Sequence, residues 1–184
     1  IGALGIVERF SVGGMFDMAT ATDLLTDAQS ALGLTVKDNE QNMINMTRVS
    51  DVLVRANTLA NASVELFSKA LTTKAATALK TLNKDIEEGV AVLAAYADQG
   101  IKGEQAGEKL HIILRDLQTA VRKNADVWSK HGMAVYDSNE KMFSIGEIVA
   151  QLEKKFMGMT DKQKAATAAM LGFKDRSFAA LQTL

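Results

Sequence analysis

The sequence predicts a mainly α-helical protein, a multi-helix bundle of antiparallel helical hairpins with one small β-hairpin near residues 133–143. Apolar residues recur at spacings of three and four along most of the chain, which is the periodicity of amphipathic helices. Proline is absent from all 184 residues, so 13 glycines supply the breaks between helices. A cluster of turn-forming residues, Asp137–Glu140, lies between two short hydrophobic runs and indicates the hairpin.

The length, charge and cysteine content of the chain limit the number of domains and the classes of function that it can have. A chain of 184 residues predicts a single mostly helical domain, 1–184, with a helical bundle at 1–121 and the hairpin and C-terminal helices at 122–184 as its sub-lobes. The first residue is not methionine, so we expect the chain to be part of a longer protein. A formal net charge of −1 argues against a protein that mainly grips phosphates. The absence of cysteine excludes disulfides and thiolate metal sites.

No membrane span or secretory signal is predicted. The longest apolar run, near residues 89–97, is far shorter than the roughly 20 residues that a spanning helix needs. The N-terminus lacks the basic region and cleavage site of a signal peptide.

Three helices are expected in the N-terminal half. The first runs from Met15 to Leu32 and ends at Gly33, whereas glycines interrupt the residues before it. Asp38 would cap a second helix that reaches about Ala60. Ser63 would cap a third helix that continues to about Leu82. The apolar seams of these helices last two to three heptads, which favours antiparallel packing over a long coiled coil.

A tight elbow between two helices is expected after Tyr96. Asp85 and Glu88 have the spacing of a capping box for the first helix of the elbow. Gly100 would end that helix in the left-handed conformation that only glycine adopts without strain, and Ile101 would then pack on Tyr96.

The second helix of the elbow begins at Gly103 and contains another glycine. Gly107 lies inside this helix, where glycine costs roughly 1 kcal/mol relative to alanine. We therefore expect a neighbouring helix to approach Gly107 closely, at Ala94 or Ala95.

Further helices follow on both sides of the hairpin. A helix from Thr119 to Lys130 would end at Gly132, which would place Met133 against Trp128. After the hairpin, Ser144 and Glu147 form a capping box that opens a helix reaching Phe156. Thr160 and Gln163 form a second capping box, and the helix that it opens reaches Leu171 and ends at Gly172. Residues 176–184 are expected to be helical.

No residue is assigned a catalytic, cofactor-binding or metal-binding role, and no cofactor is predicted. His111 and His131 lie in different helices without further ligands at metal spacing, so His111 is interpreted as a histidine in the core or at its edge. Glu104 and Glu108 share a helical face, but a glycosidase pair would face each other across a cleft, and an exposed face is the simpler interpretation.

Three other patterns have a structural interpretation beside a functional one. The Asp137–Glu140 turn has oxygen ligands but lacks the pattern of a calcium loop. The basic residues between Arg115 and Lys130 are interpreted as a solvated helix face rather than as a nucleic-acid site. The nine methionines could form an adaptable partner surface, although methionines at helical spacing are more often core residues.

The elbow also carries a family resemblance. ADQGIKGEQAG, followed by LHIILRDL, resembles the core domain of phage tail tape measure proteins. GMAVYDSNEKM and GMTDKQKAATAAMLGF resemble the short strand–turn–strand segment and the closing helix of that family. DMATATDLLTDAQSALGL and NMTRVSDVLVRANTLANASVELFSKAL are also similar, so the resemblance covers Asp17 to Leu184. Glu140 stands where the family turn commonly carries glycine, which leaves the turn type open.

The resemblance implies a structural, non-enzymatic protein of the phage or prophage tail, assembled in the bacterial host cytoplasm. It would act in tail assembly, tail length determination and genome delivery through contacts between helices. The implied partners are tail tube subunits, tail chaperones and baseplate or tip proteins, with self-association as an option and no specific nucleic acid. Two alternatives remain: a region of a tail protein associated with a cell-wall hydrolase, and a cellular helical adaptor.

Overall fold

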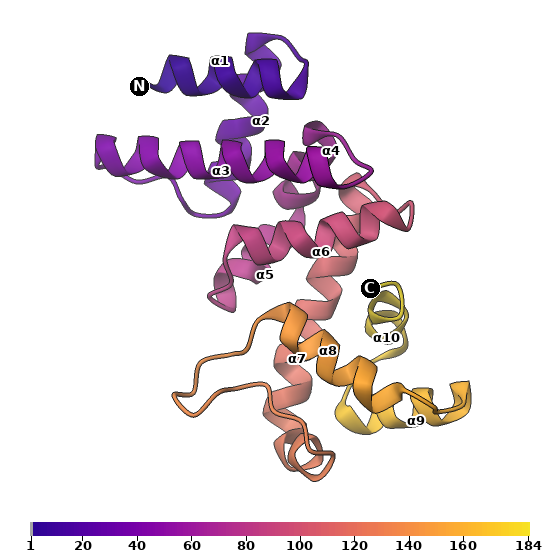
Figure 1. Cartoon of the computed structure of the whole chain (residues 1–184). Helices are drawn as coiled ribbons and strands as arrows, with labels where there is room; N and C mark the ends of the chain where they lie inside the picture. Colours follow the sequence, from indigo (N-terminus) through magenta and orange to yellow (C-terminus); the bar gives the residue numbers. More distant parts are fainter. Residues whose placement is uncertain (1) are drawn as a thin grey trace. The chain divides into compact units, whose positions relative to one another are not determined.

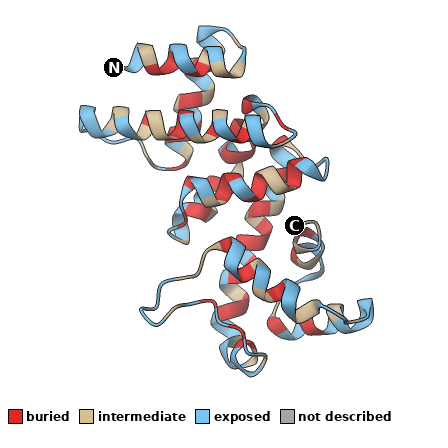
Figure 2. Cartoon of the chain, in the orientation of Figure 1, coloured by how far each residue is buried: buried red, intermediate tan, exposed pale blue. Residues whose placement is uncertain are grey.

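The computed structural model describes residues 2–184 and consists of helices joined by turns (Figure 1). The predicted mainly helical class is confirmed. The chain divides into two compact units, unit 1 up to His111 and unit 2 from Ile112 to Leu184. Buried and exposed residues alternate along most helices, as expected when each helix turns one face towards a core (Figure 2).

Unit 1 contains helices in two layers. In one layer α1 packs on α3 and α3 packs on α6, while α2, α4, η1 and α5 lie behind them (Figure 1). The elements of unit 1 are α1 (Ala3–Gly14), α2 (Met18–Ala31), α3 (Asn39–Leu59), α4 (Val64–Ala70), the π-helical turn η1 (Leu71–Ala75), α5 (Ala76–Thr81), α6 (Ile86–Asp98) and the start of α7 (Gly103–Lys130).

The start of the chain differs from the prediction. A helix, α1, forms before Met15 because Ile6, Val7 and Phe10 bury one face, and this packing outweighs the cost of its glycines. Met15 adopts the left-handed conformation with φ 58° and ends α1. The next helix therefore begins three residues later than predicted, after Asp17, whose carboxylate accepts hydrogen bonds from the backbone N–H groups of residues 19 and 20.

The second predicted helix is confirmed as α3. Asp38 caps it by accepting a 2.7 Å hydrogen bond from the Gln41 backbone N–H. The turn before α3 is held by buried Gln29, whose side-chain amide donates to the carbonyl oxygens of Leu34 and Asn42. A polar side chain in the core thus satisfies the backbone of the α2–α3 connection.

The helix predicted from Ser63 to Leu82 is interrupted. Ser63 caps α4 as expected, by accepting from the Leu66 backbone N–H, but the helix widens into η1 and resumes as α5. Thr73 lies in η1 with a non-helical ψ of −168°, and its hydroxyl donates a 2.7 Å hydrogen bond to the Ala70 carbonyl. Competition from a threonine hydroxyl for a backbone carbonyl is a known cause of such local distortion.

At the elbow, one predicted cap is wrong and the predicted stop is confirmed. Asp85 precedes α6 but makes no capping hydrogen bond, and its carboxylate lies 3.3 Å from the guanidinium of Arg48 instead. Gly100 has φ 80°, and the N–H of Ile101 donates to the carbonyl of Tyr96 at 2.9 Å. This is the Schellman arrangement expected at a glycine stop.

Gly107 is a point of close approach, but its neighbour differs from the prediction. A Cβ atom at this position would collide with the Ala70 carbonyl oxygen and the Thr73 hydroxyl, rather than with Ala94 or Ala95. The elbow helix therefore packs against the junction of α4 and η1, where the Ala70 carbonyl comes closest. The residues that interrupt the third predicted helix, Ala70 and Thr73, are therefore the same residues that contact Gly107 of the elbow.

Unit 2 contains the rest of α7 and three shorter helices, α8 (Ile145–Phe156), α9 (Asp161–Leu171) and α10 (Asp175–Leu181). The two helices predicted around Thr119 are merged into α7, which has a break at Asn124 (φ −127°, ψ 30°). Both capping boxes, at Ser144 and at Thr160, are confirmed.

Trp128 lies at the centre of the unit 2 core. Its side chain is 2% exposed, its indole N–H donates a 3.0 Å hydrogen bond to the Leu171 carbonyl, and its ring meets Phe173 edge-on at 5.8 Å. The predicted glycine stop at Gly132 is confirmed, since the N–H of Met133 donates to the Trp128 carbonyl at 3.0 Å. Both residues of the expected Trp128–Met133 pair belong to the same buried cluster.

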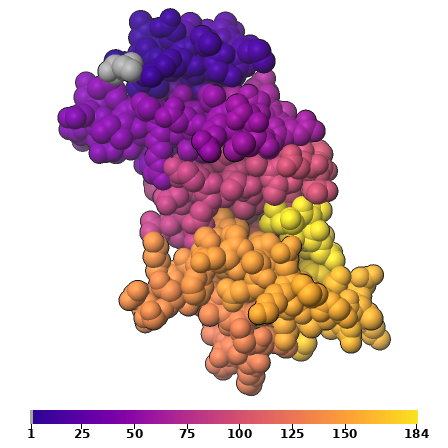
Figure 3. Space-filling model, in the orientation of Figure 1, coloured from indigo at the N-terminus to yellow at the C-terminus, as the bar shows by residue number. Residues whose placement is uncertain are grey.

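The predicted β-hairpin is wrong: no strand forms within residues 2–184, and residues 133–143 contain a single antiparallel bridge between Tyr136 and Met142. The Asp137 carboxylate holds the turn by accepting from the backbone N–H groups of Asn139 and Lys141. Met133 and Val135 pack into the helical core, and Ser144 caps α8 directly after Phe143, so the two hydrophobic runs pair at only one bridge. The segment projects from unit 2 as an ordered loop (Figures 1 and 3).

Candidate functional site

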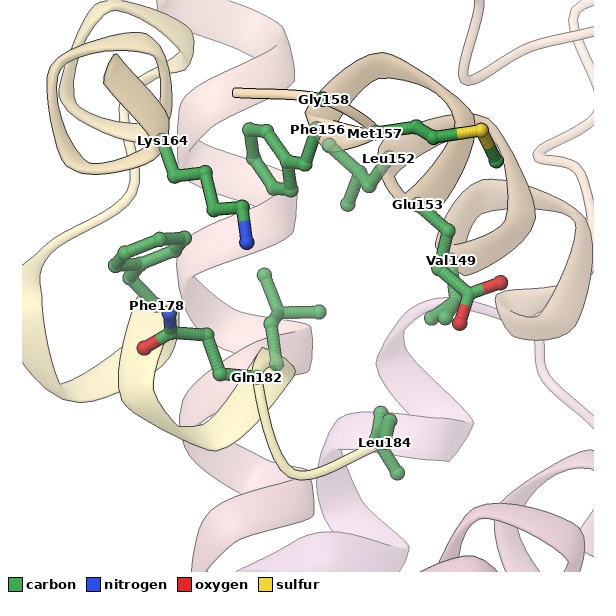
Figure 4. A pocket seen from close by; sticks show the side chains of 11 residues that line it. Val149, Leu152, Glu153, Phe156, Met157, Gly158, Lys164, Phe178, Gln182 and Leu184 are labelled. Atoms are coloured by element: carbon green, nitrogen blue, oxygen red, sulfur yellow. The ribbon is translucent and has the colours of Figure 1, made fainter. Parts of the chain in front are cut away.

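An apolar groove in unit 2, the α8–α10 groove, is the candidate site for contact with another protein (Figure 4). It has a volume of about 510 Å³ and is lined by residues of α8, α9, α10 and the turn after α8. Most of its lining is apolar: Val149, Leu152, Phe156, Met157, Phe178, Leu181 and Leu184. A hollow of this volume accommodates a few large apolar side chains, as in helix-in-groove recognition.

The apolar face of α8 both packs on the core of unit 2 and lines the α8–α10 groove. Leu152 belongs to the buried core, whereas Phe156 and Phe178 meet edge-on at 5.8 Å and form part of the wall. Met157 is 79% exposed at the end of α8, so a flexible side chain lies at the rim. Met side chains adapt their shape to a partner at low cost.

Two charged side chains line the groove from different helices. Lys164 comes from α9 and points its amine towards the hollow, and Glu153 comes from α8 on the other side (Figure 4). A partner that fills the groove would therefore need apolar side chains, with an acidic group on the side of Lys164 and no second carboxylate against Glu153.

Unit 1 carries a second apolar surface, the α1 stripe, formed by Leu4, Glu8, Val12 and Met15. Leu4, Glu8 and Val12 follow the spacing of one helical face, and Met15 is the residue that ends the helix. Leu4 and Val12 are each 74% exposed and Met15 is 91% exposed, while the opposite face of α1 packs into unit 1. Helix α1 therefore has apolar residues on its buried face and on its exposed face. Exposed apolar patches of this kind often mark sites of contact with other proteins.

The methionines are divided between core and surface. Met46 and Met133 are buried, as expected for core residues, but Met15, Met18, Met157 and Met170 are exposed. The expectation that methionines at helical spacing fill the core therefore holds for only part of the set. Sequence reasoning missed the α8–α10 groove because no local pattern shows that three short helices leave a hollow between them.

The candidate catalytic and metal-binding residues are scattered. Glu104 and Glu108 are exposed on α7, as expected for a solvated face. His111 is half-buried with an enclosed Nδ1 that has no hydrogen-bond partner, and His131 is a half-exposed residue at the end of α7. Across residues 2–184 no three acidic, histidine or cysteine side chains converge in a way that could hold a metal ion.

The basic residues of α7, Arg115, Arg122, Lys123 and Lys130, are all exposed. Arg115 also donates a 2.8 Å hydrogen bond to the neighbouring carboxylate of Asp116. Burial raises the pKa of Asp116, but the hydrogen bonds from Arg115 and Ser177 outweigh it, so the net pKa lies below its usual value. Asp116 therefore stays ionised in the core of unit 2.

In unit 1 the clearest ion pair joins α3 to α6. The Arg48 guanidinium donates to both carboxylate oxygens of Glu87, at 2.7 and 2.6 Å. This hydrogen-bonded pairing lowers the pKa of Glu87 and raises that of Arg48. Both side chains are partly exposed, so the pair orients the two helices more than it stabilises them.

Among residues 2–184, no helix is both long and apolar enough to span a bilayer.

Comparison with known proteins assigns a family. The family model described as "Phage-related minor tail protein" matches residues 4–172. The curated protein named "Tape measure protein" of Pneumococcus phage Dp-1 is 28% identical over 160 residues. That alignment covers 87% of this chain and 13% of the phage protein, so the chain spans only a small part of its relative's length. No solved structure matches the chain.

Proposed function

The chain belongs to the phage-related minor tail protein family, and we propose that it is an assembly and docking region of a tail tape measure protein. The family match over residues 4–172 carries this proposal, together with the similarity to the phage Dp-1 protein, and makes the chain a structural component of the phage tail. The family resemblance found in the sequence is thereby confirmed.

The proposed role is to organise tail assembly through helical surfaces. The partners that we propose are tube subunits, tail chaperones and baseplate or tip proteins, met in the cytoplasm of the bacterial host during assembly. The α8–α10 groove and the α1 stripe support this role because they are exposed apolar surfaces of the size that bind single helices. Genome delivery and length determination would be properties of the longer protein in which this region takes part.

The shortness of the helices favours docking over measuring. A straight α-helix rises 1.5 Å per residue, so 184 residues drawn out as one rod would span about 280 Å. The longest helix within the described residues, α7, has 28 residues and spans about 42 Å. A chain that folds back at its glycine stops contributes far less length per residue, so we propose that tail length is set by other parts of the protein.

An in-frame deletion of this region in the phage tests the role, with tails examined by electron microscopy. Loss of tails, or viable tails of almost unchanged length, is expected for a docking region. An equal deletion elsewhere in the same open reading frame serves as the control. Viable tails that shorten by about 1.5 Å for each deleted residue would show that the region is a ruler.

The two alternatives predict different results. A region that takes part in cell-wall hydrolysis would degrade peptidoglycan, and a single carboxylate substitution would abolish that turnover. A cellular adaptor would be encoded away from genes for tail tube, chaperone and baseplate proteins. Measurable turnover in the first assay, or an isolated gene in the second comparison, would count against the tail role.

A further inference from the structure

The two exposed apolar surfaces of this chain have matching chemistry. The α1 stripe places one carboxylate, Glu8, among Leu4, Val12 and Met15, all of which are exposed. The α8–α10 groove places the amine of Lys164 among mostly apolar side chains, with the carboxylate of Glu153 on the other side of the hollow (Figure 4). A carboxylate within an apolar helix face is what an amine inside an apolar groove needs when water is removed from both.

The net charges of the two units point to the same pairing. Unit 1 carries ten Lys and Arg side chains and fourteen Asp and Glu side chains, a formal charge of −4. Unit 2 carries eleven and eight, a formal charge of +3. The stripe lies on the acidic unit and the groove on the basic unit, so two copies attract each other when unit 1 of one meets unit 2 of the other.

We propose that the α8–α10 groove binds helix α1 from a second copy of this chain. Leu4, Val12 and Met15 of one copy would enter the apolar hollow of the other, and Glu8 would pair with Lys164. Helix α1 has 12 residues and is about 18 Å long, which suits a contact with three short helices. The contact joins two different surfaces, so it produces either a reciprocal dimer or a head-to-tail chain of copies.

The small size of the contact sets the conditions of the test. A single helix in a single groove belongs to the class of small, reversible interfaces. Sedimentation equilibrium from about 10 µM to about 1 mM covers the affinities expected of that class. The expected result is an average mass that rises with concentration above the 19.8 kDa of one chain. A mass that stays at one chain across this range overturns the proposal.

Charge reversal identifies the surfaces. Glu8→Lys and Lys164→Glu should each weaken association about tenfold, and the double variant should restore most of it because the pair is re-formed in reverse. Glu108→Lys, an equal change at an exposed position of unit 1 outside the stripe, should leave association unchanged. Association that is indifferent to Glu8→Lys and Lys164→Glu, or that is not restored in the double variant, assigns the contact to another surface and overturns the proposal.

Site-specific crosslinking tests the geometry with variants that keep the fold. The chain has no cysteine, so a Val12→Cys copy mixed with a Met157→Cys copy can be joined by a short bis-maleimide only between copies. Both positions are exposed, so neither change disturbs a core. The expected product is a mixed dimer that forms faster than with Ala91→Cys, an exposed control on α6, in place of Val12→Cys. Equal rates for the two pairs would mean random collision and would refute the assigned contact.

Discussion

Unit 1 and unit 2 reach a folded helical structure by different means. In unit 1 the buried side chains are mostly leucine, valine and alanine, together with Phe10, Phe67 and Tyr96. Two segments also come together there where glycine removes a side chain, because Gly107 lies against the Ala70 carbonyl and the Thr73 hydroxyl. In unit 2 one aromatic pair, Trp128 and Phe173, organises a core that also receives residues from the irregular segment after α7. The comparison teaches that close backbone contact at a glycine can join short helices in addition to large aromatic side chains.

The two units also differ in what their glycines do inside helices. A Cβ at Gly107 of unit 1 would meet backbone atoms, which cannot move aside. A Cβ at Gly146 of unit 2, on α8, would meet nothing within 4 Å. The same residue type at similar places in a helix therefore has opposite consequences, and substitutions can separate them.

The largest expected effect is on the aromatic core of unit 2. Trp128→Ala should lower the free energy of unfolding by about 4 kcal/mol, because it removes a 2% exposed ring and the hydrogen bond to Leu171. Urea unfolding followed by circular dichroism measures the change. Trp128→Phe is the matched control and should lose clearly less, since it keeps a ring against Phe173. Trp128 is the only tryptophan, so its emission should be blue-shifted in the folded parent protein; a water-like maximum would contradict its placement.

The next effect concerns the close approach in unit 1. Gly107→Ala should lower the free energy of unfolding by about 2 kcal/mol, and Gly107→Leu by more, because the added atoms collide with the Ala70 carbonyl and Thr73. Thermal and urea melts give the result. A melt of Gly107→Leu that matches the parent protein would show that α7 does not approach η1 as described.

A smaller effect depends on pH and on the buried carboxylate of unit 2. The folded-state pKa of Asp116 is lowered, so its ionised form stabilises the protein above the unfolded pKa of about 4, and this contribution disappears as pH falls through the folded pKa. Asp116→Asn should therefore be less stable than the parent by about 1 kcal/mol at pH 7, with the difference shrinking towards pH 3. Urea unfolding at both pH values measures it. A difference that grows on acidification would reverse the assigned sign.

The smallest effect is a gain in unit 2. Gly146→Ala should raise the free energy of unfolding by about 0.5 kcal/mol, because alanine favours the helix and its methyl group meets open space. Differential scanning calorimetry of the parent and variant measures the shift. Gly107→Ala is the matched comparison, since it is expected to lower the free energy of unfolding. If both substitutions lower it, the proposed difference between the two glycines is wrong.

Local chemistry explains which parts of the fold the sequence by itself determined. Asp38, Ser144 and Thr160 cap their helices as predicted, because a side-chain oxygen at the N-cap meets backbone donors only three residues away. Gly100 and Gly132 end helices as predicted, because the left-handed conformation is a property of one residue. The family resemblance was likewise present in contiguous residues, and the family match confirmed it.

Tertiary structure decided the features that depend on residues far apart in the chain. Thr73, where the helix is broken, contacts Gly107, which is more than thirty residues away in the chain. No local sequence pattern contains such a contact. The strands expected around Asp137 did not form, because Met133 and Val135 pack into the helical core and α8 begins at once after Phe143. The α8–α10 groove has the same origin. Capping and helical stops are determined over three to five residues, whereas a hollow or a close approach exists only after separate helices have packed.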